Sequence, residues 1–365
     1  MHKSAAWPLA LIYAALVVYA SLYPFADWRN QGMSPWVYLA APIPRYWSSF
    51  DVAINVIGYL PLGALLALGI LRSGRTGPHV LLLPLLLGGT LSLLLEAAQT
   101  YLPARVASRE DWLLNVTGCL AGAVGMGVLA RAGVLGLWSR IRAHWFVPEA
   151  RGALVLLALW PVALLFPAAI PFGLGQVFER LEEGLGAWLA DTPVLDWLPM
   201  RTTELQPLVP GAEMLCVALG LLTPCLLGFC VVRSIGRRWA LVAILLAAGV
   251  AVSALSAALS WGPAHAWAWL GVPAQVGLAV GWTLALGLAL APWRMSAALL
   301  LLCLGVLLSL LNQAPESPYF AQTLQAWEQG RFIRFHGLAQ WLGWLWPYAT
   351  LVYVLGLLGR RSTQN

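Results

Sequence analysis

Charged residues are scarce in this chain. Asp, Glu, Lys and Arg make up 10% of its 365 residues, whereas apolar residues make up 60%. A water-soluble domain needs a larger polar surface, so this balance excludes an ordinary soluble globular protein and favours a polytopic helical membrane protein. Cysteine is scarce as well. All five cysteines lie in apolar runs and show no metal-type or disulfide-type spacing.

Long apolar runs are abundant instead. Ten of them reach about 17–25 residues, the length that crosses a bilayer as a helix. They lie near residues 5–22, 52–71, 79–101, 112–130, 152–171, 211–232, 239–260, 272–291, 295–311 and 338–358. The sequence therefore predicts an all-α polytopic integral membrane protein with about ten transmembrane helices.

The distribution of positive charge predicts the orientation. With the N-terminus inside, 13 of the 21 Lys and Arg residues fall in cytoplasmic segments, as the positive-inside rule requires. Ten spans then place both termini in the cytoplasm. This pattern also explains the net charge of +6, so we expect no nucleic-acid partner.

Three domains are expected. Residues 1–131 form a four-helix membrane domain, and residues 152–365 form a six-helix domain with amphipathic outer insertions at 172–209 and 312–337. The linker, residues 132–151, contains Trp138, Arg140, Ile141 and Arg142 in a basic amphipathic pattern. Such a segment is typical of a helix that lies on anionic lipid at the cytoplasmic surface.

Two matching helix starts stand out in the first domain. Residues 51–58 and 111–118 both have the pattern D-x-x-x-N-V-x-G, which suggests parallel pseudo-repeats like those that flank transporter sites. The second copy continues with Gly118, Gly122 and Gly125, a small-residue face that permits close helix contact.

Polar side chains from three neighbouring helices are expected at one level. Asn55 and Asn115 lie one turn, about 6 Å, below Asp51 and Asp111, and Glu96 lies near the outer end of the helix between them. Buried ionisable groups in a membrane are costly and usually functional. The candidate ligand-binding residues are Asp51, Asn55, Glu96, Gln99, Arg105, Ser108, Asp111 and Asn115.

A structural interpretation of the same residues stays open. Asn and Gln often act as hydrogen-bond links between transmembrane helices, and Asp51 and Asp111 are suited to be helix N-caps. Ser108 lies three residues before Asp111, which is capping-box spacing. Arg105 is placed to pair with Glu96 or Asp111, or to hold an external anion. Glu96 fits the structural interpretation least well, because a buried carboxylate needs a cation, a proton or a function.

These motifs, taken in order, resemble the VanZ-like family over about residues 5–131. The resemblance rests on the following motifs: Tyr23-Pro24-Phe25, Asp51-x3-Asn55, Tyr59-x-Pro61-Leu62-Gly63, Glu96-x2-Gln99, Arg105, Ser108-x2-Asp111-x3-Asn115 and Gly118. It implies a small integral membrane domain in the inner (cytoplasmic) membrane of bacteria, and an association with low-level resistance to the glycopeptide antibiotic teicoplanin.

The favoured hypothesis is a non-enzymatic binding or translocation role. The outer-leaflet site would hold the headgroup of a membrane lipid or a lipid-linked envelope precursor, with no metal and no cofactor. One alternative is an intramembrane metal-assisted hydrolase or transferase, since Asp51, Glu96 and Asp111 form an oxygen-rich set suited to Mg²⁺ or Ca²⁺. Another is a scaffold for an envelope-polysaccharide complex, with envelope-biosynthesis proteins as partners.

Overall fold

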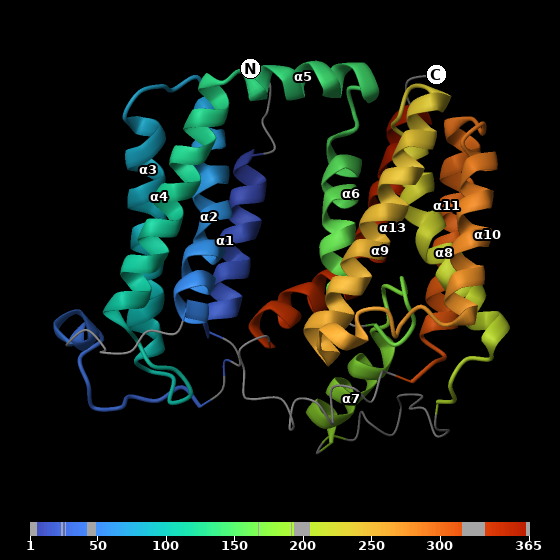
Figure 1. Cartoon of the computed structure of the whole chain (residues 1–365). Coiled ribbons are helices and arrows are strands. Elements are labelled where there is room, and N and C mark those ends of the chain that lie inside the picture. Colours follow the sequence, from blue (N-terminus) through green and yellow to red (C-terminus); the bar gives the residue numbers. More distant parts are fainter. Residues whose placement is uncertain are drawn as a thin grey trace. The chain divides into compact units, whose positions relative to one another are not determined.

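Helices form the framework of the chain in the computed structural model (Figure 1). The structure describes residues 6–22, 25, 27–41, 49–166, 168–190, 192, 205–315 and 333–362. Within these ranges the one β-type pairing is an isolated antiparallel bridge between Phe146 and Val232. The expected all-α fold is therefore confirmed for the described residues.

Seven of the described helices are long and apolar enough to cross a membrane. They are α2 (Ser49–Arg72), α3 (His79–Gln99), α4 (Arg109–Arg131), α8 (Pro210–Phe229), α9 (Ile235–Trp261), α11 (Trp293–Leu311) and α13 (Ile333–Ser362). Three shorter apolar helices are α1 (Ala6–Leu22), α6 (Arg151–Ala163) and α10 (Val272–Leu288). These helices are typical of a multi-pass membrane protein. The count of ten spans and the cytoplasmic placement of both termini stay predictions.

The chain divides into two compact units, Met1–Ile141 and Arg142–Asn365. The division falls inside α5 (Val134–Trp145), and so within the segment expected to be a linker, residues 132–151.

In the first unit, glycines bring α2 and α4 into backbone contact. A Cβ atom at Gly63 of α2 would overlap the carbonyl oxygen of Cys119. Cβ atoms at Gly118 and Gly122 of α4 would overlap the carbonyl oxygens of Val56 and Leu60. Lipid tails are as apolar as the helices, so close backbone approach, and not apolar burial, is what favours this pairing.

The expected small-residue face is shorter than its sequence pattern. Gly125 has no atom within 4 Å of the position a Cβ would take, so the close contact ends at Gly122. On the α3 side, Cys119 is fully buried and its thiol donates to the carbonyl of Pro84 at 3.1 Å. The small residues of α4 thus contact both α2 and α3.

The described parts of α1 and of the loop before α2 both bond to this three-helix core. The Tyr13 hydroxyl of α1 donates to the carbonyl of Gly58 in α2 at 2.9 Å. The loop before α2, which includes the 3₁₀ turn η1 (Val37–Ala40), bonds to the end of α3. There, the Gln31 amide donates to the carbonyl of Thr100 at 2.9 Å, and the Tyr38 hydroxyl donates to the carbonyl of Leu93 at 3.0 Å.

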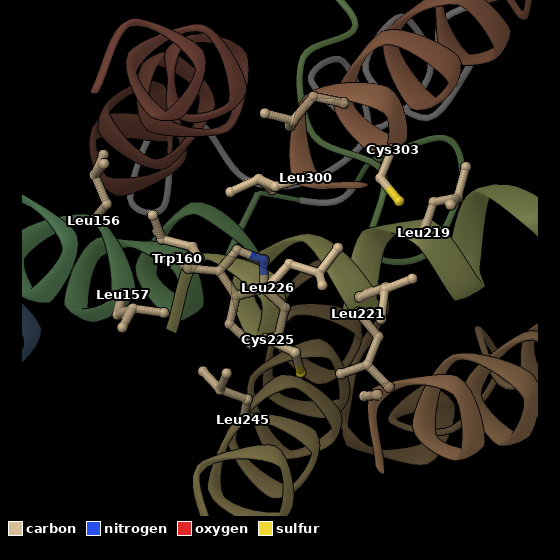
Figure 2. Packing of buried hydrophobic residues seen from close by; sticks show 14 of the residues in the cluster. Leu156, Leu157, Trp160, Leu219, Leu221, Cys225, Leu226, Leu245, Leu300 and Cys303 are labelled. Carbon is tan, nitrogen blue, oxygen red and sulfur yellow. The ribbon is translucent and has the colours of Figure 1, made fainter. Parts of the chain in front are cut away.

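The second unit is organised around α8. In α8, 78% of the apolar window is buried inside the protein, against 28–39% in the other six long helices. Figure 2 shows side chains of α6, α8, α9 and α11 converging near Trp160, which is fully buried. The turn η3 (Pro263–His265) follows α9.

The sixth helix is shorter than expected. The predicted span 152–171 was too long, because α6 ends at Ala163. Pro171 disfavours helix at the residue before it, and Phe172 and Gly175 have φ angles of 62° and 99°, outside the helical region. The irregular segment that follows is nevertheless buried, with Phe172 against Gly220 of α8 and Gly249 of α9.

Asn312, at the end of α11, satisfies the backbone of this irregular segment. Its carboxamide oxygen accepts the N–H groups of Val177 and Phe178, both at 3.0 Å, and its nitrogen donates to the carbonyl of Gly175 at 3.2 Å. The Tyr348 hydroxyl of α13 donates to the same carbonyl at 3.2 Å. Irregular backbone in apolar surroundings is tolerated only when its polar groups are satisfied in this way.

The first outer insertion contains the expected amphipathic helix, α7 (Phe178–Leu189). Leu181, Leu185 and Trp188 are exposed at helical spacing along one side of it. In the second insertion, residues 316–332 lie outside the described residues.

The glycine contacts predict a position-specific effect on stability. Gly122→Ala places a methyl group against the Leu60 carbonyl and should lower the free energy of unfolding by about 1–3 kcal/mol. Gly125→Ala, one turn away in open space, should leave stability unchanged or raise it by up to about 1 kcal/mol, because alanine is the better helix former. The midpoint of unfolding in mixed detergent measures both; equal midpoints for the two variants would contradict the contact.

Candidate functional site

The candidate residues gather where α2 begins, α3 ends and α4 begins, all at one end of the first unit (Figure 1). Asn55 is half-buried on α2, Glu96 is buried on α3, and Asp111 is half-buried on α4. Asp51 is the third residue of α2, but its side chain lies outside the described part of the structure.

One hydrogen bond joins the two copies of the repeated motif. The Asn55 amide donates to an Asp111 carboxylate oxygen at 2.7 Å, a short, charge-assisted bond between α2 and α4. Asp111 is not the N-cap of α4, so that interpretation was wrong; it is the third residue of the helix. From this position its side chain faces α2.

Ser108 is the N-cap of α4, as its spacing predicted. Its hydroxyl oxygen accepts the backbone N–H of Asp111 at 3.2 Å and its O–H donates to Glu110 at 2.8 Å. In a capping box the third helical residue would return a bond to the N-cap backbone. Here a carboxylate oxygen of Glu96, from α3, accepts the Ser108 N–H at 2.9 Å. Asp111 is thereby left to bind Asn55.

This arrangement explains how Glu96 is accommodated. Its carboxylate, on a residue only 4% exposed, lies at the N-terminus of α4, where the helix dipole and an N–H donor both favour negative charge. Part of the role of Glu96 is therefore to join α3 to α4.

Gln99 and Arg105 contact the end of α1. The Gln99 amide donates to the carbonyl of Ser21 at 3.1 Å, and the Arg105 guanidinium donates to the carbonyl of Ala20 at 3.1 Å. These carbonyls belong to the last turn of α1, where the C=O groups have no N–H partner within the helix. Both side chains thus satisfy carbonyl groups in the last turn of α1.

A deeper polar layer lies one turn below. The Asn115 amide nitrogen donates to Ser92 Oγ at 3.0 Å, but its carbonyl oxygen has no hydrogen-bond partner among the described residues. The Tyr59 hydroxyl has no partner at hydrogen-bond geometry there either. Both residues are 5% exposed. Ser92, as a hydrogen-bonding side chain, and Glu96, as a charge, are both close enough to act on the Tyr59 hydroxyl, which places it in the same layer.

The candidate residues chosen from the sequence do not include Tyr59 or Ser92, although the spacing of Ser92 to Glu96 predicts that Ser92 extends the same face inward. The signal that indicates them is helical spacing. Tyr59 lies four residues after Asn55 and Ser92 lies four residues before Glu96, so each shares a face with a residue that was chosen.

Tyr38 is a further neighbour that the sequence did not indicate. It is 2% exposed, and burial, followed by the charge of Glu96, raises the pKa of Tyr38 to about 12. Its hydroxyl therefore stays protonated at neutral pH. It contacts the site because the loop before α2 folds back onto α3, a tertiary contact without a local sequence pattern.

The described residues do not form a metal centre. Among them, no group of three or more His, Cys, Asp or Glu side chains is arranged to hold a metal ion. The oxygen-rich set proposed for Mg²⁺ or Ca²⁺ includes Asp51, whose side chain is outside the described part. The remaining two carboxylates, Glu96 and Asp111, have hydrogen bonds to Ser108 and Asn55.

The bond between the two motifs can be measured as a coupling energy. In a double-mutant cycle, Asn55→Ala and Asp111→Ala should be non-additive by about 1–2 kcal/mol in unfolding free energy, because each change removes the same charge-assisted bond. Asn55→Ala with Thr117→Ala is the matched control: Thr117 is exposed on α4 and bonds within its own helix. That pair should be additive within about 0.5 kcal/mol. Additivity in the Asn55–Asp111 cycle would contradict the bond.

Comparison with known proteins places this site inside a recognised domain. Residues 8–130 match the family model described as VanZ-LLP1: VanZ/LLP1. No curated protein and no solved structure matches the chain. The match contains every candidate residue and ends one residue before α4 does. The N-terminal third of this chain is therefore a VanZ-like domain.

Proposed function

We propose that the VanZ-like domain binds the headgroup of a phospholipid or a lipid-linked envelope precursor in a bacterial inner membrane, as a binding or translocation protein. The observation that carries the proposal is the deeper polar layer. There, the Tyr59 hydroxyl and the Asn115 carbonyl oxygen are buried without a hydrogen-bond partner among the described residues.

Unsatisfied polar atoms are costly in apolar surroundings. Each buried group without a partner costs about 1–3 kcal/mol, and native proteins contain few of them. Two such groups, from Tyr59 of α2 and Asn115 of α4, lie next to Ser92 of α3. A ligand hydroxyl would donate to the Asn115 oxygen and accept from the Tyr59 hydroxyl, so a hydroxylated headgroup suits this layer.

The candidate residues one turn above this layer have a different role in the proposal. Asn55, Gln99 and Ser108 already have bonds within the protein, so they position the helices around the ligand. The charged residues Glu96, Arg105 and Asp111 set the electrostatic character of the entrance. Arg105 and Arg109 are the cations placed to meet a phosphate group. The implied association with teicoplanin resistance would follow if the bound lipid were a cell-wall precursor.

Tyr59→Phe separates ligand binding from folding. Removal of a hydroxyl without a partner should leave the unfolding free energy unchanged within about 0.5 kcal/mol. It should also remove the bound lipid. Lipid mass spectrometry on gently purified protein and a detergent unfolding curve measure the two effects.

Tyr13→Phe is the matched control. This variant loses the same atom, but there the hydroxyl donates to the Gly58 carbonyl. It should lose about 0.5–1.5 kcal/mol of stability and retain the lipid. Identical lipid content in Tyr59→Phe and wild-type protein would sink the proposed site.

Glu96→Gln tests the carboxylate charge. Glutamine retains an oxygen that accepts the Ser108 N–H, so the helix contact and the folded state should persist, whereas the charge is lost. We expect the unfolding midpoint to shift little and the co-purified lipid to fall strongly in the mass spectrum. Normal lipid content with normal stability would show that Glu96 serves only to cap α4.

A further inference from the structure

The linker helix α5 has an exposed apolar side. None of its residues is buried. Val134, Leu137, Trp138 and Ile141 lie at i, i+3, i+4 and i+7, and their exposed fractions range from 38% to 50%. This spacing gathers them on one side of the helix. Exposed apolar side chains of this size, gathered in one patch, indicate a surface that contacts something else.

The place of α5 in the chain restricts what covers this side. Only Ala132 and Gly133 separate α5 from the end of α4, a helix long enough to cross a membrane. The Arg72 guanidinium, from the last residue of α2, donates to Ser139 Oγ at 3.2 Å. Since α2 and α4 both end here, α5 begins at the membrane boundary, and it runs across their direction (Figure 1).

The charge around α5 is predominantly positive. Arg72, Arg75, Arg131 and Arg140 are exposed at this end of the first unit. The connection at 72–79 contains no Asp or Glu, and Glu149 is the one acid between α4 and α6. An apolar side flanked by arginines, with Trp138 among its members, has the chemistry of a helix that lies between headgroups and acyl chains.

We propose that α5 lies in the headgroup layer of the bilayer and that the arginines around it bind anionic phospholipid. The apolar side enters the acyl boundary, and the guanidinium groups meet phosphate oxygens. This surface is at the opposite end of the first unit from the candidate site, because α2 and α4 have their first residues at the site and their last residues here. It is therefore independent of the proposed headgroup site.

The depth of two neighbouring positions tests the proposal. Ile141 and Ala143 are two residues apart, on opposite sides of α5, and both are exposed. In the full-length protein, Ile141→Cys or Ala143→Cys is labelled with a nitroxide. All five native cysteines are buried. The protein is reconstituted in vesicles of phosphatidylcholine with phosphatidylglycerol. The label at 141 should be accessible to oxygen and shielded from a water-soluble nickel chelate, and the label at 143 should show the reverse. Equal accessibility of both labels to the nickel chelate overturns the proposal.

A second measurement tests the charge. Arg131→Gln and Arg140→Gln should each reduce the ratio of phosphatidylglycerol to phosphatidylcholine retained by the purified protein by about fivefold. Arg29→Gln makes the same charge change on an exposed residue of the loop before α2 and should leave the ratio unchanged. If all three variants retain the wild-type ratio, or if Arg29→Gln reduces it equally, anionic-lipid binding by α5 is wrong. Circular dichroism of each variant checks that the helices persist.

Discussion

A carboxylate buried on an apolar helix is stable only where its charge is met, and in the VanZ-like domain the start of a neighbouring helix meets it. The Ser108 N–H donates to Glu96, so one bond fixes where α4 begins against the side of α3. The position of every later residue of α4 follows from that start. Asp111 then faces Asn55 and Asn115 faces Ser92. The polar layers of the site therefore depend on the Glu96–Ser108 contact.

Glycine packing makes this arrangement possible. Gly63, Gly118 and Gly122 let the backbones of α2 and α4 touch, and only at that separation can a short asparagine side chain reach across to Asp111. Tyr59 and Asn115 are buried in the same three-helix core, and one polar atom of each has no hydrogen-bond partner among the described residues. Packing and polarity are thus linked: the contact that stabilises the domain also creates the hydrogen-bonding potential that we assign to a ligand.

Much of the fold could be predicted from the sequence, because hydrophobic length acts locally. Each of the ten apolar runs overlaps a helix in the described part of the chain, and the Ser108 cap was evident from its three-residue spacing to Asp111. The hydrogen-bond partners of the site residues were less predictable. Capping-box spacing assigned the reciprocal bond to Asp111, but Glu96, twelve residues from Ser108, makes it. Tyr38 joins the site through a loop that folds back onto α3, and α6 ends early where backbone conformation overrides apolar length.

In the second unit, few side chains could replace Asn312. One carboxamide accepts from two amide groups and donates to a carbonyl of the same irregular stretch. Aspartate could accept but not donate, and leucine could do neither. The Gly175 carbonyl has a second donor in Tyr348, whereas the Asn312 oxygen accepts from both Val177 and Phe178. Substitutions tolerated at this position should therefore be confined to side chains that retain an oxygen acceptor.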